Sequence, residues 1–248
     1  MLTSFAGGAV FGRRHGERPV LALHGWGRSS ADFDAVLVET GGLAIDLPGF
    51  GASPPPETPI GARGYAESIL DVLDSFDEPP VVLGHSFGGR VAVALEALRP
   101  GSFSAAVLTG VPLVRLTGGI RPPMSYRLLR AANRVGLIGD DRMESIRRRR
   151  GSADYRAAVG VMRDVLVIAV NESYEDELAA LDLPIRLIWG ANDQEVPVAV
   201  ARRASEILES AGVTDLDLML VDSAGHQLPI THPRVLVDAV HEVAPWTR

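Results

Sequence analysis

Short apolar runs alternate with amphipathic segments along most of the chain. Apolar runs with few polar interruptions are typical of strands that are buried on both faces of a parallel sheet. We predict such strands at 19–24, 43–46, 81–85, 105–109, 185–189 and 216–221, after edge strands near 4–5 and 9–11. Apolar residues recur at helical spacing between these runs, and we predict helices at 60–76, 90–98, 198–210 and 233–243. We predict another helix that ends near Val38, with Ser29 or Ser30 as its N-cap. This alternation predicts an α/β fold, with a mostly parallel sheet and helices on both faces.

The pattern changes between residues 112 and 182, where no strand-like run occurs. Helical spacing predicts helices there at 125–135, 140–150, 154–170 and 174–181. We interpret 112–182 as a helical lid that is inserted into a core formed by residues 1–111 and 183–248.

Composition narrows the class of protein. The 248 residues are enough for one sizeable core, and contents of 46% hydrophobic and 22% charged residues are ordinary for a globular protein. The net charge of −7 argues against general nucleic-acid binding, because a phosphate backbone would be repelled. The chain has no cysteine, which excludes disulfides and thiolate metal ligands and suits a reducing compartment. No apolar run reaches the roughly 18 residues of a membrane span. The apolar start of the chain also lacks the preceding positive charges of a signal peptide, so we expect a cytoplasmic protein. We expect the protein to be a monomer or a homodimer.

Two features of the predicted lid are candidates for substrate contact. Val159, Met162 and Leu166 share one face of the helix predicted at 154–170. This face either packs the lid on the core or lines an apolar pocket for an acyl chain. The lid also carries Arg142 and the run Arg147–Arg150 on an otherwise acidic protein. This basic cluster is either a solvated helix face or a docking patch for an acidic carrier protein or an anionic substrate.

One stretch has the pattern of a nucleophile in a sharp turn. An apolar run leads into Gly84-His85-Ser86-Phe87-Gly88, which is G-x-S-x-G, and a helical pattern follows directly. Between a strand and a helix, this motif holds the serine in a strained conformation with its hydroxyl exposed. Glycines at 84 and 88 keep Cβ atoms out of the space where strand and helix pass closely. The Phe87 N–H at the helix N-terminus would point to where a negative oxygen forms.

A serine nucleophile requires a base, and that base requires a group that orients it. Histidine suits the role of base, and His226 follows the last predicted strand at the same edge of the sheet as Ser86. His85 adjoins Ser86 on an extended segment, so its side chain points the opposite way. Asp193 follows the strand at 185–189 and is our candidate acid, with Glu195 as the second choice. The alternative is a surface turn, in which Asn and Asp are common.

The chain resembles the alpha/beta-hydrolase superfamily over nearly all of its length except the lid. The matching segments are His24-Gly25-Trp26-Gly27, Asp46-Leu47-Pro48-Gly49-Phe50-Gly51 with Ser53, Gly84–Gly89, Gly190 with Asp193, Val196 and Pro197, and Gly225-His226. The resemblance implies acyl transfer without a metal or an organic cofactor, with an oxyanion hole formed by the N–H groups of Trp26 and Phe87. It also implies that His24 and Asp46 are structural. The short oxyanion loop and the helical lid look like those of microbial carboxylesterases, including those that hydrolyse a methyl ester on a carrier-bound acyl chain.

Other readings use the same fold. A carbon–carbon bond hydrolase, a lyase or a peroxide-dependent acyl transferase would employ the same Ser86, Asp193 and His226. The serine at the turn departs from the dehalogenases and epoxide hydrolases of this superfamily, which place an aspartate there. A non-catalytic binding protein of this fold often lacks one of the three side chains or the oxyanion loop, and this chain has all of them. The sequence therefore favours an enzyme that cleaves esters of small or medium acyl chains.

Overall fold

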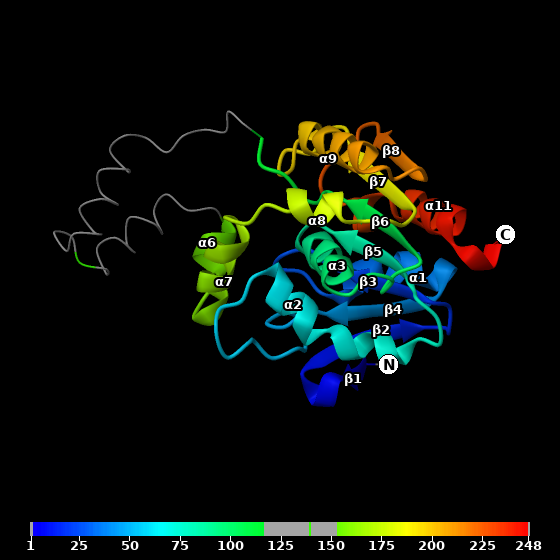
Figure 1. Cartoon of the computed structure of the whole chain (residues 1–248). Helices are drawn as coiled ribbons and strands as arrows, with labels where there is room; N and C mark the ends of the chain where they lie inside the picture. The colour runs from blue at the N-terminus through cyan, green and yellow to red at the C-terminus, as the bar shows by residue number, and fades with distance from the viewer. Residues whose placement is uncertain (1, 117–138, 140–152, 248) are drawn as a thin grey trace.

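A single mixed sheet organises the molecule (Figure 1). The computed structural model describes residues 2–116, 139 and 153–247. The strands are β1 (Leu2–Phe5), β2 (Val10–His15), β3 (Val20–Leu23), β4 (Gly42–Asp46), β5 (Val81–His85), β6 (Ala105–Thr109), β7 (Ile185–Gly190) and β8 (Leu216–Val221). Their order is β1-β2-β4-β3-β5-β6-β7-β8, in which β2 is antiparallel to both neighbours and all pairs from β4 to β8 are parallel. The predicted mostly parallel sheet is confirmed, and its antiparallel edge is formed by the two N-terminal strands.

Helices cover both faces of this sheet (Figure 1). The described α-helices are α1 (Asp34–Thr40), α2 (Ala62–Ser68), α3 (Phe87–Leu98), α6 (Ala153–Ala157), α7 (Val161–Ala169), α8 (Glu175–Ala179), α9 (Val198–Ala211), α10 (Leu228–Thr231) and α11 (Pro233–Val243), with 3-10 helices at Ala6–Gly8, Ser30–Phe33, Leu70–Ser75 and Pro245–Thr247. Helices α1 and α11 pack together on one face, and α2, α3, α8 and α9 cover the other. None of the helices in the described part of the chain is long and apolar enough to span a membrane.

Strand β3 illustrates why the central strands are apolar on both sides. Its four residues have no exposed surface. Val20 and Ala22 join the apolar cluster under α1 and α11, whereas Leu21 and Leu23 join the cluster under α2 and α3. Successive side chains of a strand point to opposite faces, so a strand that is covered on both faces needs a continuous apolar run.

Two of the predicted helices begin or continue as 3-10 helix. The segment that starts at Ser30 is a 3-10 helix before α1 begins, and neither Ser29 nor Ser30 caps it with its hydroxyl. The carboxylate of Asp46 accepts the Ser30 N–H at 2.7 Å instead, which corrects the predicted serine cap. The segment predicted as a helix over 60–76 changes at Ile69, where φ is −110° and ψ is 4°, from α2 to a 3-10 helix.

The predicted lid is described only in part. The helices predicted at 125–135 and 140–150, with Arg142 and Arg147–Arg150, lie outside the described residues. Residues 153–182 contain α6, α7 and α8 and no strand. The prediction of one continuous helix at 154–170 is wrong, because Gly160 adopts φ 55° and ψ −139° between α6 and α7. Glycine reaches this conformation at low cost because it has no Cβ.

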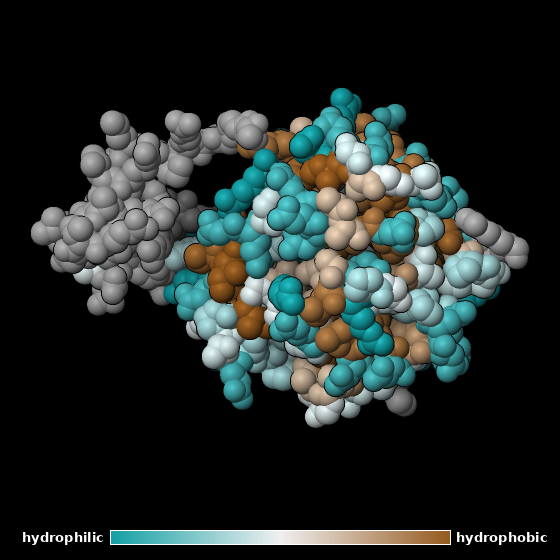
Figure 2. Space-filling model, viewed as in Figure 1, coloured by the Kyte–Doolittle hydropathy of each residue, from teal (hydrophilic) through white to brown (hydrophobic). Residues whose placement is uncertain are grey.

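The break at Gly160 separates residues that were expected to share a face. Val159 precedes the break and is 70% exposed, so it does not share one continuous helical face with Met162 and Leu166, and its contact with a substrate stays a prediction. Leu166 is buried within α7, and the Met162 sulfur lies 3.8 Å from the Tyr65 hydroxyl. Figure 2 shows apolar residues at the surface in the region of α7.

A buried arginine joins the helix of the serine turn to the described ends of the predicted lid. Arg90 of α3 donates from Nη1 to the Ala169 carbonyl at 2.6 Å and from Nε to the Pro112 carbonyl at 3.1 Å. Its guanidinium also lies over the Tyr174 ring, 5.6 Å from the centroid. The Arg90 side chain therefore binds the chain at Pro112, before residues 117–152, and at Ala169, after them.

Candidate active site

Ser86 occupies the sharp turn between β5 and α3. Its backbone has φ 50° and ψ −115°, a strained combination for a residue with a side chain. Between residues 81 and 96 every residue is buried except Ser86, which is partly exposed. The turn thus presents a single side chain of this stretch to a substrate.

Two glycines make this turn possible, as the motif predicts. A Cβ at Gly88 would overlap the carbonyl oxygen of Leu23 on the neighbouring strand, and a Cβ at Gly84 would lie 2.6 Å from the Cα of Gly89. Both glycines have backbone on the other side of the gap, which cannot move aside as a flexible side chain could. Glycine is therefore required for α3 to pass so close to β3 and β5.

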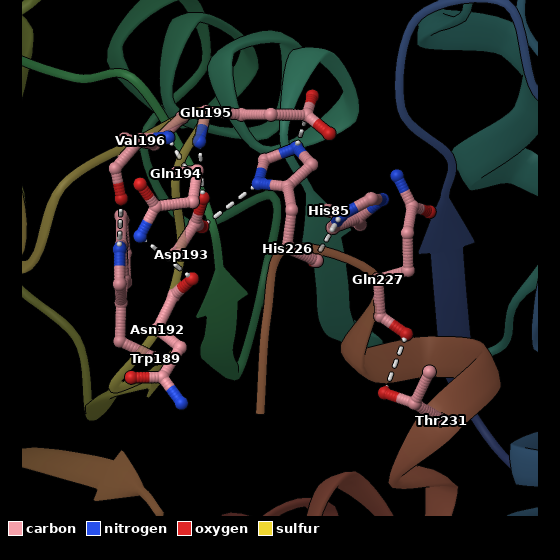
Figure 3. Close-up of polar contacts among 10 residues, drawn as sticks. All are labelled: His85, Trp189, Asn192, Asp193, Gln194, Glu195, Val196, His226, Gln227 and Thr231. Carbon is pink, nitrogen blue, oxygen red and sulfur yellow. Dashed lines mark hydrogen bonds and ion pairs between the residues drawn. The ribbon is translucent and has the colours of Figure 1, made fainter. Parts of the chain in front are cut away.

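A buried histidine–carboxylate pair lies at the same end of the sheet (Figure 3). His226 Nδ1 lies 2.8 Å from Asp193 Oδ2. Asp193 follows β7, and His226 lies in the loop between β8 and α10. The imidazole packs on Gly110, directly after β6, where a Cβ would lie 2.9 Å from two ring atoms. The structure therefore brings together the predicted base and the predicted acid.

Asp193 is kept ionised by its hydrogen bonds. The backbone N–H groups of Glu195 and Val196 donate to its Oδ1, each at 2.8 Å. Burial by itself raises the pKa of Asp193, but the hydrogen bonds from His226, Val196 and Glu195 outweigh it and bring the pKa below its ordinary value. An ionised carboxylate accepts a hydrogen, so we assign the neutral imidazole as carrying its proton on Nδ1 and a lone pair on Nε2.

The other ring nitrogen of His226, Nε2, is not the one that contacts Asp193. The nearest charged group in the described structure is Glu195, whose Oε2 lies 3.6 Å from Nε2 (Figure 3). No hydrogen bond joins the Ser86 hydroxyl to Nε2. Such bonds are often long before a substrate is present.

Two contacts nevertheless tie the serine turn to the histidine loop. The Ser86 N–H donates to the Thr109 carbonyl at 2.9 Å. The residue after Thr109 is Gly110, and the imidazole of His226 packs against it. His85 Nε2 lies 3.0 Å from the His226 carbonyl oxygen, and the two rings are 4.9 Å apart between centroids. Ser86 and His226 thus contact adjacent residues, Thr109 and Gly110, at the end of β6.

His85 has a role that the sequence pattern did not reveal. Burial, reinforced by the neighbouring His226, lowers the pKa of His85 to about 3. The ring is therefore neutral near pH 7, and its Nε2–H donates to the His226 carbonyl. A positive charge here would stand beside the ring of His226, whose centroid is 4.9 Å away.

We expect His85 to make the protein sensitive to acid. Its folded pKa of about 3 lies below the ordinary value of 6.5, so the unfolded chain binds a proton that the folded chain does not. The stabilisation is complete above pH 6.5 and is lost as the pH falls toward 3, with a slope of up to about 1.4 kcal/mol per pH unit. Denaturant unfolding from pH 7 to 4 should show a shallower fall for His85→Gln than for the wild type. The partly exposed His232→Gln is the control, and equal slopes for all three proteins would contradict the assignment.

Two backbone N–H groups beside Ser86 are candidates for an oxyanion hole. These groups belong to Trp26, in the loop after β3, and to Phe87, the first residue of α3; neither has an acceptor among the described residues. A Cβ at Gly25 would lie 3.3 Å from the Ser86 Cβ, so the Trp26 loop passes directly beside the serine. The N-terminal end of α3 adds a partial positive charge.

The residues assigned a structural role hold the surrounding loops. His24 Nδ1 lies 2.7 Å from the Gly25 carbonyl, and its Nε2 accepts the Leu47 N–H at 3.0 Å. Burial lowers the pKa of His24, which keeps the ring neutral for this donor and acceptor pattern. Asp46 Oδ2 accepts the Ala52 N–H at 2.8 Å. These contacts fit the structural roles that the resemblance implied.

An aromatic cluster forms one side of the site. Trp26 meets Phe50 and Phe87 edge-on, with ring centroids 5.0 and 5.4 Å apart, and Tyr65 lies 4.9 Å from Phe87. Met162 of α7 reaches this cluster through its contact with Tyr65. Because Trp26 and Met162 are only partly buried, they are the members available to an apolar substrate group. Among residues 2–116, 139 and 153–247, no cluster of side chains has the composition of a metal site.

Comparisons with known proteins place the chain in a family. The profile of the Alpha/beta hydrolase family matches residues 20–239, so the chain belongs to this family and is an enzyme of the α/β-hydrolase class. It is similar to the non-heme chloroperoxidase of Streptomyces lividans, with 28% identity over 95% of both chains. It is also similar to the pimeloyl-[acyl-carrier protein] methyl ester esterase of Serratia marcescens, with 26% identity over 91% of this chain and 93% of the relative. A solved esterase from Thermogutta terrifontis shares the fold, with a TM-score of 0.69, 18% identity and coverage of 98% of this chain and 97% of that chain.

Proposed function

We propose that the protein is a serine hydrolase that cleaves carboxylic esters through Ser86, His226 and Asp193. The observation that carries the proposal is the buried Asp193–His226 pair at the rim where the strained Ser86 is exposed. The carboxylate fixes the imidazole tautomer that leaves a lone pair on Nε2. A histidine in that state is the base that a serine hydroxyl needs.

The proposed reaction begins when side-chain rotation brings the Ser86 hydroxyl within hydrogen-bond reach of Nε2. The hydroxyl proton moves to Nε2 as Oγ forms a bond to the ester carbonyl carbon. The carbonyl oxygen becomes negative and accepts hydrogen bonds from the N–H groups of Trp26 and Phe87; each such donor typically contributes about 10²–10³ in rate. Nε2 then gives its proton to the leaving alcohol as the carbon–oxygen bond breaks.

The second half of the reaction returns the enzyme to its resting state. Water gives a proton to Nε2 and attacks the acyl group on Ser86. The carboxylic acid leaves, and the proton passes back to Oγ. Asp193 remains ionised throughout and stabilises the positively charged imidazole.

Small and medium acyl chains are the proposed substrates. The apolar side formed by Trp26 and Met162 supports a site for the acyl chain, and Leu166 is a buried residue of the same helix as Met162, α7. The similarity to a pimeloyl-[acyl-carrier protein] methyl ester esterase supports one particular member of this class, an acyl chain on an acidic carrier protein. Arg147–Arg150 are then the proposed docking residues for the carrier.

A peroxide-dependent activity is the second candidate, and the similarity to a non-heme chloroperoxidase favours it. Hydrogen peroxide would replace water in attacking the acyl group on Ser86. The product would be a peracid, and the other steps would be unchanged.

A substrate panel tests these proposals. It contains p-nitrophenyl esters from acetate to laurate and the methyl ester of an acyl chain on acyl-carrier protein, each with and without hydrogen peroxide. We expect turnover of the short or medium esters and labelling of the protein by a fluorophosphonate. Turnover of no ester, with no labelling, would favour a non-catalytic binding protein.

A further inference from the structure

The site contains a carboxylate that the proposed reaction does not use. Glu195 Oε2 lies 3.6 Å from His226 Nε2, and the Glu195 side chain is 63% exposed (Figure 3). No N–H or O–H group in the described part of the chain donates to this carboxylate. Its two oxygens are therefore available to a partner that enters from solvent.

The backbone of Glu195 is fixed although its side chain is exposed. Its N–H donates to Asp193 Oδ1 at 2.8 Å, so the carboxylate that orients His226 also positions Glu195. The next residue, Val196, is buried, and its carbonyl accepts the Trp189 indole N–H at 2.9 Å. Rotation of the Glu195 side chain therefore starts from a fixed backbone beside His226. The neighbouring Gln194 turns away and donates to the Asn192 carbonyl at 3.4 Å.

The resting imidazole does not use this carboxylate as an acceptor. Asp193 takes the hydrogen on Nδ1, which leaves a lone pair on Nε2. A lone pair and a carboxylate share no hydrogen, so the 3.6 Å approach is not a hydrogen bond in this state. Glu195 thus contributes a negative charge beside the atom that handles the proton.

The position of the Glu195 carboxylate beside Nε2 indicates which part of an ester substrate would lie next to it. In the proposed reaction Nε2 protonates the oxygen of the leaving alcohol, so groups beside Nε2 lie on the leaving-group side. The acyl side is different in character, because Trp26 and Met162 make it apolar. The two sides of the site therefore favour different chemistry on the two halves of an ester.

We propose that Glu195 makes the leaving-group side selective for esters whose alcohol carries a positive charge close to the ester oxygen. This inference rests on the proposed ester hydrolysis. An ammonium group two carbons from that oxygen would lie beside the carboxylate, whereas an anionic alcohol would be repelled. The ammonium takes no part in the chemistry: the acyl–oxygen bond breaks, Nε2 supplies the proton, and the amino alcohol leaves with its charge unchanged.

The expected selectivity is modest, because Glu195 is largely exposed to solvent. Ion pairs at such positions correspond to about a 1.5- to fivefold preference in kcat/KM. The preference should shrink in high salt, since exposed charges are screened.

The test compares two esters of the same shape that differ in charge. The choline ester has a quaternary nitrogen where the 3,3-dimethylbutyl ester has a carbon, and the acyl chain is the one that the p-nitrophenyl panel favours. The ratio of kcat/KM for the charged ester over the neutral ester is measured in the wild type, Glu195→Gln and Glu195→Lys. Asp217→Asn, an exposed acid on β8, is the matched control.

We expect a wild-type ratio of about 1.5 to five, a ratio near one in Glu195→Gln, a ratio below one in Glu195→Lys, and the wild-type ratio in Asp217→Asn. A wild type that hydrolyses the neutral ester with a ratio near one, or a Glu195→Gln variant that keeps the wild-type ratio, overturns this inference and leaves the proposed function intact. A wild type that hydrolyses neither ester and none of the panel overturns both.

Discussion

Replacing Ser86 with alanine should abolish ester hydrolysis, with kcat lower by about 10⁶. No other hydroxyl on the exposed face of this turn can take the place of Oγ, because residues 81–96 are otherwise buried. Release of p-nitrophenol and labelling by a fluorophosphonate both report on this loss. The labelling experiment detects the nucleophile itself, even when the chosen ester is a poor substrate.

The loss in Ser86→Ala should not result from unfolding. The Ser86 hydroxyl has no hydrogen-bond partner among the described residues, so its removal leaves no buried group unsatisfied. The variant should therefore unfold at the wild-type denaturant midpoint. Ser210→Ala, on the exposed end of α9, is the control and should keep full activity. Undiminished labelling of Ser86→Ala would place the nucleophile elsewhere.

Replacing Asp193 with asparagine should lower kcat by about 10⁴ while the protein still folds. The amide preserves the size of the side chain but not its charge. It can donate to Nδ1 and so hold the wrong tautomer, with the proton on Nε2, where it blocks general-base catalysis. It also cannot stabilise the positively charged imidazole. Steady-state kinetics on the best p-nitrophenyl ester measures the effect, which should fall on kcat far more than on KM.

Comparison with Glu195→Gln decides which acid orients the histidine. Asp193 contacts Nδ1 at 2.8 Å and is buried, whereas Glu195 lies 3.6 Å from Nε2 and is exposed. Asp193→Asn should therefore cause much the larger loss on the neutral p-nitrophenyl ester. The opposite order would show that Glu195, the second candidate from the sequence, is the orienting acid.

The periodic pattern of the sequence was sufficient for the sheet. Each central strand is covered on both faces, so each appears as a continuous apolar run, and β5 and β6 lie where the runs predicted them. The edge strand β8 also lies at its predicted residues, although it is partly exposed. The same reasoning placed Ser86, Asp193 and His226 at strand ends, because the carboxyl ends of parallel strands share one edge of the sheet. The pairing of Asp193 with His226 then follows from topology, although 33 positions separate them in the chain.

Helix continuity was less predictable. Apolar residues on both sides of Gly160 keep the helical period, so the pattern gave no sign that its backbone would adopt a conformation that interrupts the helix. The serines before α1 resemble a helix cap, yet the acceptor is Asp46, which comes from the next strand and could not be assigned by local spacing. In the first place the backbone of one residue determined the result, and in the second a contact from outside the local segment did.

The sequence by itself determined the fold class, the serine turn and the candidates for the acid and the base, because these depend on local periodicity and on residues at strand ends. Only the tertiary structure decided what surrounds His226: a neutral His85 at its carbonyl oxygen, Gly110 against Nδ1 and Cε1 of its ring, and Glu195 beside Nε2. These three neighbours come from the ends of three different strands. Their distances depend on how β5, β6 and β7 align across the sheet, which no spacing along the chain encodes.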